Sequence, residues 1–175
     1  DAMEVRAATR AAIQSKKPTY LRIGKKREPV IHQSPLTNFE IGKAIQVKRG
    51  EKVALLVTGN LLPNVVEATD LLKEKGINPS IYSHHTVKPL DLNNLEHSFK
   101  TYDHVFSIEE HSLIGGFGSA IAEWKCRQIN STCSFSSIGT PDTFLHKTGD
   151  QDAARELTGL TTKQIAEQII FHYSK

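Results

Sequence analysis

The sequence predicts a three-layer α/β/α fold, in which helices cover both faces of a mostly parallel sheet. Short runs of β-branched and aliphatic residues alternate with longer segments whose apolar residues recur every three or four positions. Strands that alternate with helices in this way form right-handed crossovers and a parallel sheet. The run Val53–Val57 is apolar throughout, as in strands buried on both faces. A short strand at 44–47 meets the next through a turn at Gly50, so we expect it antiparallel at an edge.

The composition is that of an ordinary globular protein. Of the 175 residues, 38% are hydrophobic and 23% are charged, and the net charge is +3. Lysine and arginine are spread along the chain, and the basic triplet 25–27 is interpreted as a solvated loop. No apolar stretch reaches the roughly 18 residues of a membrane span, and the acidic first residues, without an apolar core, lead us to expect no signal peptide. We therefore expect no nucleic-acid partner and no membrane association.

The chain has two cysteines, Cys126 and Cys133. Two residues cannot form a disulfide framework, and their separation fits no zinc pattern. We interpret them as reduced thiols, which favours a cytoplasmic protein.

The first 40 residues predict the end of one domain and a linker. Residues Ala2–Ser15 have helix-forming side chains with apolar positions three and four apart, and Pro18 ends this helix. The run 19–23 (T-Y-L-R-I) is typical of a strand. A helix and strand without a sheet would be stable only beside further chain, so we interpret residues 1–24 as the end of a truncated domain. Residues 25–40 lose all periodicity, which predicts an interdomain linker.

Residues 41–175 predict the main domain. Further strands are expected at 77–83, 105–108 and 133–138, with amphipathic helices between them. After the strand at 53–57, Asn60 is expected to cap a helix that has Pro63 in its first turn. Gly76 is expected to end that helix as its C′ residue.

Three further signals define the remaining helices. Asp91 is expected to cap the helix that precedes the strand at 105–108. A helix is expected around 152–157, with Gly159 just after it. Thr161 and Gln164 have the spacing of a capping box, which predicts a last helix.

The stretch 109–123, E-E-H-S-L-I-G-G-F-G-S-A-I-A-E, joins a strand end to a helix start. Open α/β sheets usually contact ligands or partners at such a place. Backbone N–H groups near Gly115, Gly116 and Gly118 could cradle a phosphate. The spacing is neither G-x-G-x-x-G nor a P-loop, however, so we favour close backbone packing as the reason for the glycines.

Histidines and carboxylates also mark the predicted strand ends. His84, His85 and His111 could relay protons or bind a metal there. Adjacent residues of a strand point to opposite faces, so His84 and His85 cannot easily share one ion, and we interpret them as polar rim residues. Glu109 and Glu110 diverge for the same reason. We expect one of them to accept hydrogen bonds from backbone donors or from a basic partner.

The chain has no G-x-S-x-G motif and no cysteine with an activating neighbour in the sequence. We therefore predict no catalytic residue and no metal ligand within it.

Taken together, the motifs resemble the C-terminal part of the transketolase family. The matching segments are I-G-K-A at 41–44, V-A-L-L-V-T-G-N at 53–60, H-T-V-K-P-L-D at 85–91, the stretch 109–123, I-G-T-P-D-T-F at 138–144 and G-L-T-T-K-Q-I at 159–165. The upstream P-T-Y-L-R-I-G-K at 18–25 resembles the end of the pyrimidine-binding domain of that family. Residues 1–24 would then close that domain, and residues 41–175 would be the transketolase C-terminal domain.

The resemblance implies a five-stranded mixed sheet with one antiparallel edge strand. It also implies thiamine-diphosphate-dependent transfer of a two-carbon ketol unit between sugar phosphates. The related 1-deoxyxylulose-5-phosphate synthases and the beta subunits of 2-oxo-acid dehydrogenases are alternatives. In this family the cofactor and its Mg2+ lie between domains of different subunits, and the glutamate that activates the cofactor lies upstream of this segment. We therefore expect this chain to bind no cofactor alone, to serve a homodimer, and to need the remaining transketolase domains or an N-terminal subunit.

The resemblance also carries over a substrate position. Family members hold the sugar phosphate with an arginine near the end of the pyrimidine domain, and this position falls on Lys25, with Arg22 the nearest arginine before it, three residues earlier. A lysine would replace a bidentate clamp by a point charge. His111 is a weaker candidate contact. Glu109, Glu110 and the three glycines of the turn are expected at an interface.

Another class of function stays open at this stage. A free-standing regulatory module could bind an anion or nucleotide at residues 115–118.

Overall fold

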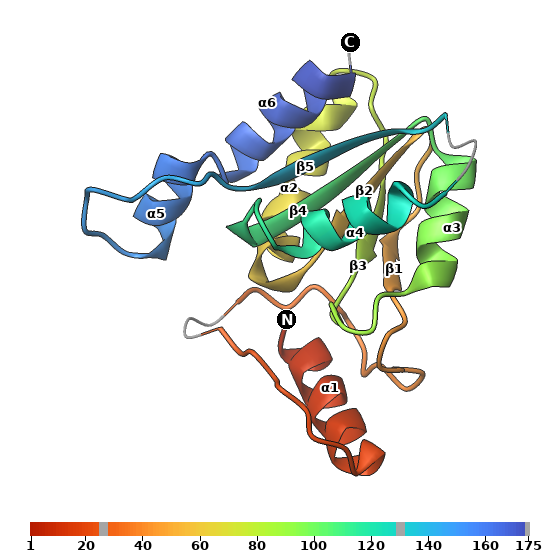
Figure 1. Ribbon diagram of the computed structural model, residues 1–175. Helices are drawn as coiled ribbons and strands as arrows, with labels where there is room; N and C mark the ends of the chain where they lie inside the picture. The colour runs from red at the N-terminus through yellow and green to blue at the C-terminus, as the bar shows by residue number, and fades with distance from the viewer. Residues whose placement is uncertain (25–27, 129–131, 174–175) are drawn as a thin grey trace.

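The computed structural model shows a three-layer α/β/α domain with an additional N-terminal helix (Figure 1), and it describes residues 1–24, 28–128 and 132–173. The five strands are β1 (Ile45–Lys48), β2 (Val53–Val57), β3 (Ser80–Ser83), β4 (His104–Ser112) and β5 (Ser134–Thr140). Their order in the sheet is β1-β3-β2-β4-β5. Strand β1 pairs antiparallel with β3, and every other pairing is parallel. The predicted fold class, including the antiparallel edge strand, is confirmed.

The edge strand β1 pairs with β3 and not with β2, which follows it in the sequence. The turn at Gly50 passes the start of β3, where Gly50 N donates to Ser80 Oγ (2.8 Å) and Glu51 N donates to Asn78 O (2.7 Å). A side chain at Gly50 would collide with the backbone of Asn78 and Pro79. Close approach therefore requires glycine at this turn.

Helices cover both faces of the sheet. On one face lie α2 (Leu62–Lys73) and α6 (Thr162–Tyr173), and on the other lie α3 (Leu92–Thr101) and α4 (Phe117–Lys125). Strand β2 is apolar throughout because both of its faces are covered by helices. Val53, Leu55 and Val57 pack under α2 and α6. Ala54 and Leu56 pack under α3 and α4. All five side chains are fully buried.

The start of α2 differs from the prediction, whereas its end agrees with it. Asn60 does not cap the helix, because a short 3-10 turn, η1 (Gly59–Leu61), comes first. Pro63 lies in the first turn of α2, as expected. At the other end, Ile77 N donates to Leu72 O (3.0 Å) and Gly76 N to Lys73 O (2.9 Å). This is a Schellman motif with Gly76 at C′ and φ +73°, as predicted.

The other helix signals are confirmed. Asp91 caps α3 by accepting from Asn94 N (3.1 Å). Helix α5 (Gln151–Thr158) ends at Gly159, whose φ is +78°. The capping box forms at the start of α6, with Thr161 N and Gln164 N donating to each other's side chains at 3.2 and 3.4 Å.

Three strands differ in length from the prediction, and β5 (Ser134–Thr140) ends two residues after the expected 138. Strand β4 continues to Ser112, because its pairing with β5 extends to Ser112 opposite Thr140. Glu109, Glu110 and His111 therefore lie on the strand itself and not in a turn. Strand β3 begins only at Ser80, because the preceding Pro79 has no N–H to donate to a ladder.

The N-terminal segment forms its helix but not its strand. Helix α1 (Ala2–Ser15) is capped by Asp1, which accepts from Met3 N and Glu4 N at 3.0 Å each. Residues 19–23 form no strand, since no neighbouring strand completes their hydrogen bonds, and Tyr20 is 88% exposed. Asp1 also accepts from Ile31 N (2.7 Å), so α1 is tied to the segment that follows it. Within the described residues, no helix is long and apolar enough to cross a membrane.

Candidate functional site

The carboxyl ends of the parallel strands β2, β3 and β4 meet at one edge of the sheet, which we call the carboxyl edge. Thr58 links all three strands there. Its backbone N–H donates to Ile108 O (3.0 Å), and its hydroxyl donates to His84 O (2.9 Å). The structure thereby brings His84 and Glu109, which are 25 residues apart in the sequence, to the same edge.

The Glu109 carboxylate fills the N-terminus of α4. It accepts from Phe117 N (2.6 Å) and Gly118 N (2.7 Å), and the residue is 1% exposed. A carboxylate at this place is stabilised by charge-assisted hydrogen bonds and by the positive end of the helix dipole. The two N–H groups that could have cradled a phosphate are therefore already used. This argues against an anion or nucleotide site at residues 115–118.

The glycines around this carboxylate give it room. A side chain at Gly116 would collide with the Glu109 carboxylate and with Ser112 O. A Cβ at Gly118 would lie 2.6 Å from the hydroxyls of Ser107 and Ser137. Close packing is therefore the role of both glycines: Gly116 approaches a backbone oxygen, as predicted, whereas Gly118 approaches side chains of the sheet. Both contacts lie within the same domain, and the interface expected at this turn stays a prediction. Gly115 differs, because it has open space around it and a φ of +74°, which L-residues rarely adopt.

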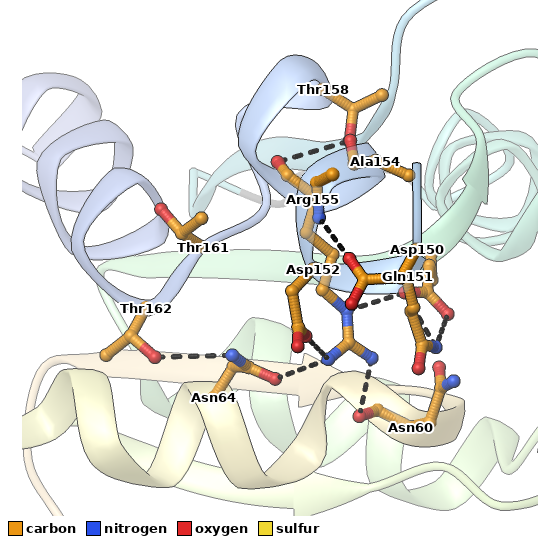
Figure 2. Close-up of polar contacts among 12 residues, drawn as sticks. Asn60, Asn64, Asp150, Gln151, Asp152, Ala154, Arg155, Thr158, Thr161 and Thr162 are labelled. Carbon is orange, nitrogen blue, oxygen red and sulfur yellow. Dashed lines mark hydrogen bonds and ion pairs between the residues drawn. The ribbon is translucent and has the colours of Figure 1, made fainter. Parts of the chain in front are cut away.

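Glu110 points to the other side of β4 and binds Arg155 on α5. Arg155 Nε donates to Glu110 Oε1 (2.6 Å), and Gln151 Nε2 lies 3.0 and 3.2 Å from the two carboxylate oxygens. The guanidinium of Arg155 also donates to Asn64 Oδ1 and to Asn60 O, both at 3.3 Å (Figure 2). Arg155 is 7% exposed, so this network ties α5 to β4 and α2.

The two adjacent carboxylates thus diverge, as the strand geometry predicts. Glu109 takes backbone donors and Glu110 takes a basic partner. The sequence did not indicate Arg155, because it lies 45 residues after Glu110 and belongs to no motif. Asn60 takes part through its backbone oxygen, which side-chain patterns do not reveal.

The histidines do not converge on one site. His84 is 1% exposed, its Nε2 lies 3.0 Å from Asn94 Oδ1, and burial lowers its pKa to about 4, so it is neutral at pH 7. His85 faces away from it and stacks on Phe39 with ring centres 4.0 Å apart. His111 is exposed, with Nδ1 3.4 Å from Ser112 O. Among the residues that the structure describes, no three His, Cys, Asp or Glu side chains are placed to hold a metal ion.

Two of the three expected substrate contacts, Lys25 and Arg22, belong to the N-terminal segment, whereas His111 lies on β4. Arg22 is exposed, and Lys25 lies outside the described residues. The same N-terminal part of the chain forms a pocket of about 260 Å³ between α1 and residues 35–39, and Arg6 and Arg10 line it. These positions stay predictions.

The Cys133 thiol is not an activated nucleophile. Cys133 is buried, and burial raises its pKa to about 11. Cys126 is exposed at the end of α4.

Comparison with known proteins decides the family. Residues 42–165 match the family model described as "Transketolase, C-terminal domain". The chain belongs to the transketolase C-terminal domain family. It is 33% identical over 175 residues to the 1-deoxy-D-xylulose-5-phosphate synthase of Haemophilus influenzae, covering 100% of this chain and 27% of that protein. It is 32% identical to a Methanocaldococcus jannaschii protein that is named as a transketolase C-terminal section, covering 95% of this chain and 51% of the relative.

Solved structures agree with this transketolase assignment. A structure named "Split gene transketolase, inactive beta4 tetramer" has a TM-score of 0.86 and 30% identity, covering 95% of this chain and 54% of that one. The transketolase of Campylobacter jejuni, at 17% identity and a TM-score of 0.51, shares the fold. The chain therefore spans between about a quarter and about half of the relatives that it matches.

The neutral buried His84 predicts a pH-dependent stability. The ordinary pKa of histidine is 6.5, and that of His84 in the folded chain is about 4. At a pH between these two values, His84 binds a proton in the unfolded chain but not in the folded chain. Its stabilising effect is thus fully present above pH 6.5 and is lost as the pH falls towards 4, by about 3 kcal/mol. Urea unfolding at pH 7 and pH 4 should show the wild type losing about 3 kcal/mol more than His84→Gln. Equal losses in both proteins would contradict this.

The Glu110–Arg155 pair, in which Arg155 is buried and Glu110 half-buried, predicts a second effect on stability. Arg155→Met keeps the bulk of the side chain but leaves Glu110 without its charged donor, so the free energy of unfolding should fall by about 2–3 kcal/mol. In a double-mutant cycle with Glu110→Gln the two losses should not add. The matched control is Lys163→Met, because Lys163 forms an exposed pair with Glu167 at 3.8 Å that contributes little. Equal effects of Arg155→Met and the control would count against the network.

Proposed function

We propose that this chain is the C-terminal segment of a thiamine-diphosphate-dependent transketolase-type enzyme and that it serves subunit assembly. The enzyme would transfer a two-carbon ketol unit between sugar phosphates. The match of residues 42–165 to the transketolase C-terminal domain carries the proposal. The carboxyl edge supports the assembly role, because Glu109 occupies the helix N-terminus where a ligand would otherwise bind.

Enzymes of this family generally depend on thiamine diphosphate, but the described residues of this chain do not fit that cofactor. A diphosphate needs a cluster of free donors, and those at the start of α4 are bonded to Glu109. Mg2+ needs several oxygen ligands together, and the described residues offer no acidic cluster of this kind. We therefore propose that other domains hold the cofactor and Mg2+, and that this chain has no catalytic residue.

The partners that we propose are the remaining transketolase domains, on the same polypeptide or on an N-terminal subunit. Coverage of only 27% of the Haemophilus influenzae synthase and 54% of the split-gene chain supports this. That split-gene chain is named as a beta4 tetramer, which supports self-association of copies of this chain, with a homodimer as the basic unit. On this proposal residues 1–24 close a pyrimidine-binding domain and residues 25–40 link it to the C-terminal domain. Since the relatives are metabolic enzymes, we propose a cytoplasmic location.

A 1-deoxyxylulose-5-phosphate synthase is the second candidate. All 175 residues of the chain align with that enzyme of Haemophilus influenzae at 33% identity, and they cover 27% of the enzyme. A lysine at position 25, in place of the expected arginine, also leaves open whether the substrate is phosphorylated. In both cases Lys25, with Arg22 and His111 as weaker candidates, is the proposed contact for the substrate.

Cofactor titration and assay of the parent enzyme test this proposal. Calorimetric titration with thiamine diphosphate and Mg2+ should show binding to the parent and none to the isolated 175-residue chain. The parent should catalyse ketol transfer between sugar phosphates, and formation of 1-deoxyxylulose 5-phosphate instead would favour the second candidate. Lys25→Ala should raise KM for the phosphorylated substrate more than Arg22→Ala does. A parent that does not bind the cofactor would overturn the proposal.

A further inference from the structure

The carboxylate of Asp1 is fully buried and accepts hydrogen bonds from two segments of the chain. Its Oδ1 accepts from Met3 N and Glu4 N, which caps α1 as described above. Its Oδ2 accepts from Ile31 N (2.7 Å) and His32 N (2.8 Å), and it lies 3.1 Å from His32 Nδ1. One carboxylate thus holds both the start of a helix and a segment that follows 30 residues later.

The second of these segments is seated on the C-terminal domain. We call residues 28–39 the strap, and Figure 1 shows it in orange, running between α1 and the sheet. Ile31 packs against the hydrophobic core under α2 and α6. Phe39 stacks on His85, just after β3, with ring centres 4.0 Å apart. The linker that the sequence predicts is therefore bound to the domain and is not a free tether.

The Asp1 contacts close a loop that contains the proposed substrate contacts. Because Asp1 and Ile31 are bonded directly, residues 2–30 leave the strap and return to it. Arg22 is exposed on this loop, and Lys25 belongs to it by sequence. The base of the loop is therefore held on the C-terminal domain through Asp1 and the strap.

The same loop also reaches the carboxyl edge. A Cβ at Gly24 would lie 3.3 Å from Glu28 Oε1 and 3.8 Å from Asn60 Nδ2. Asn60 lies in η1, just after β2, and its backbone oxygen accepts from Arg155. Gly24, the residue before Lys25, thus lies beside an edge whose own groups are fixed by hydrogen bonds.

We infer that Asp1 is a positioning residue, whose carboxylate clamps α1 to the strap and thereby holds the substrate-binding loop on the C-terminal domain. The inference rests on the function proposed above, in which Lys25 and Arg22 contact the substrate. Asp1 is itself buried, so it acts through the strap and not on the substrate. Without the clamp the loop would sample more positions, and ordering it would cost binding free energy. The C-terminal domain thus serves substrate binding in addition to assembly.

Amide hydrogen exchange, followed by NMR on the 175-residue chain, tests the clamp. Asp1→Ser keeps a good N-cap for α1 but lacks the second oxygen that binds the strap. The amides of Ile31 and His32 should exchange at least about tenfold faster in this variant, while amides inside α1 keep their rates. Equal exchange of these two amides in wild type and variant would overturn the clamp.

Two neighbouring residues of the strap test its seating on the domain. Ile31→Ala removes the packing against the core, so the amide of His32 should again exchange faster. The matched control is Val30→Ala, because Val30 is 52% exposed and should leave this exchange unchanged. Equal effects of the two variants would show that the strap is not seated through Ile31, which contradicts the inference.

Kinetics of the parent enzyme test the positioning role. Asp1→Ser should raise KM for the substrate by roughly threefold to tenfold, with kcat and the affinity for thiamine diphosphate unchanged. A loss of folded enzyme would lower kcat instead. An unchanged KM in a variant whose strap amides are released would overturn the positioning role. A parent that binds no thiamine diphosphate would overturn the proposed function and this role together, whereas hydrogen exchange alone judges the clamp.

Discussion

The contact on which the domain most depends is that of the Glu109 carboxylate with the N–H groups of Phe117 and Gly118. It satisfies two donors that a helix start otherwise leaves unpaired, and it does so where the positive end of the helix dipole meets the end of β4. The contact requires α4 to approach the sheet closely, which in turn requires glycine at 116 and 118. The sequence E-E-H-S-L-I-G-G-F-G is thus one structural unit, built around a buried charge.

The neighbouring Glu110 completes this arrangement on the opposite face. Successive residues of a strand point to opposite sides, so one dipeptide binds α4 on one side and α5 on the other. Through Arg155 the second contact reaches the start of α2 and anchors the loop before α5. The carboxyl edge, where open α/β domains usually bind ligands, is therefore occupied by the domain's own side chains. This is why we favour assembly as the role of this domain.

The sequence predicted what depends on local patterns. The strand at 53–57, the Schellman glycine at 76 and the capping box at 161–164 all follow from spacing and residue type. The divergence of Glu109 and Glu110 follows from strand geometry alone. The partner of Glu110 could not be predicted, because Arg155 is 45 residues away and comes close only through the tertiary fold. The strand expected at 19–23 failed because a strand needs a neighbour, and the described chain provides none there.

The central role of the Glu109 carboxylate is tested most directly by the free energy of unfolding of Glu109→Gln. The control is Glu123→Gln, on the exposed side of α4. An amide has the same shape but lacks the charge, and one of its two polar groups cannot accept from an N–H. The account predicts a loss of about 2–3 kcal/mol for Glu109→Gln and less than about 0.5 kcal/mol for the control. Equal stability of the two variants would contradict the central role of this carboxylate.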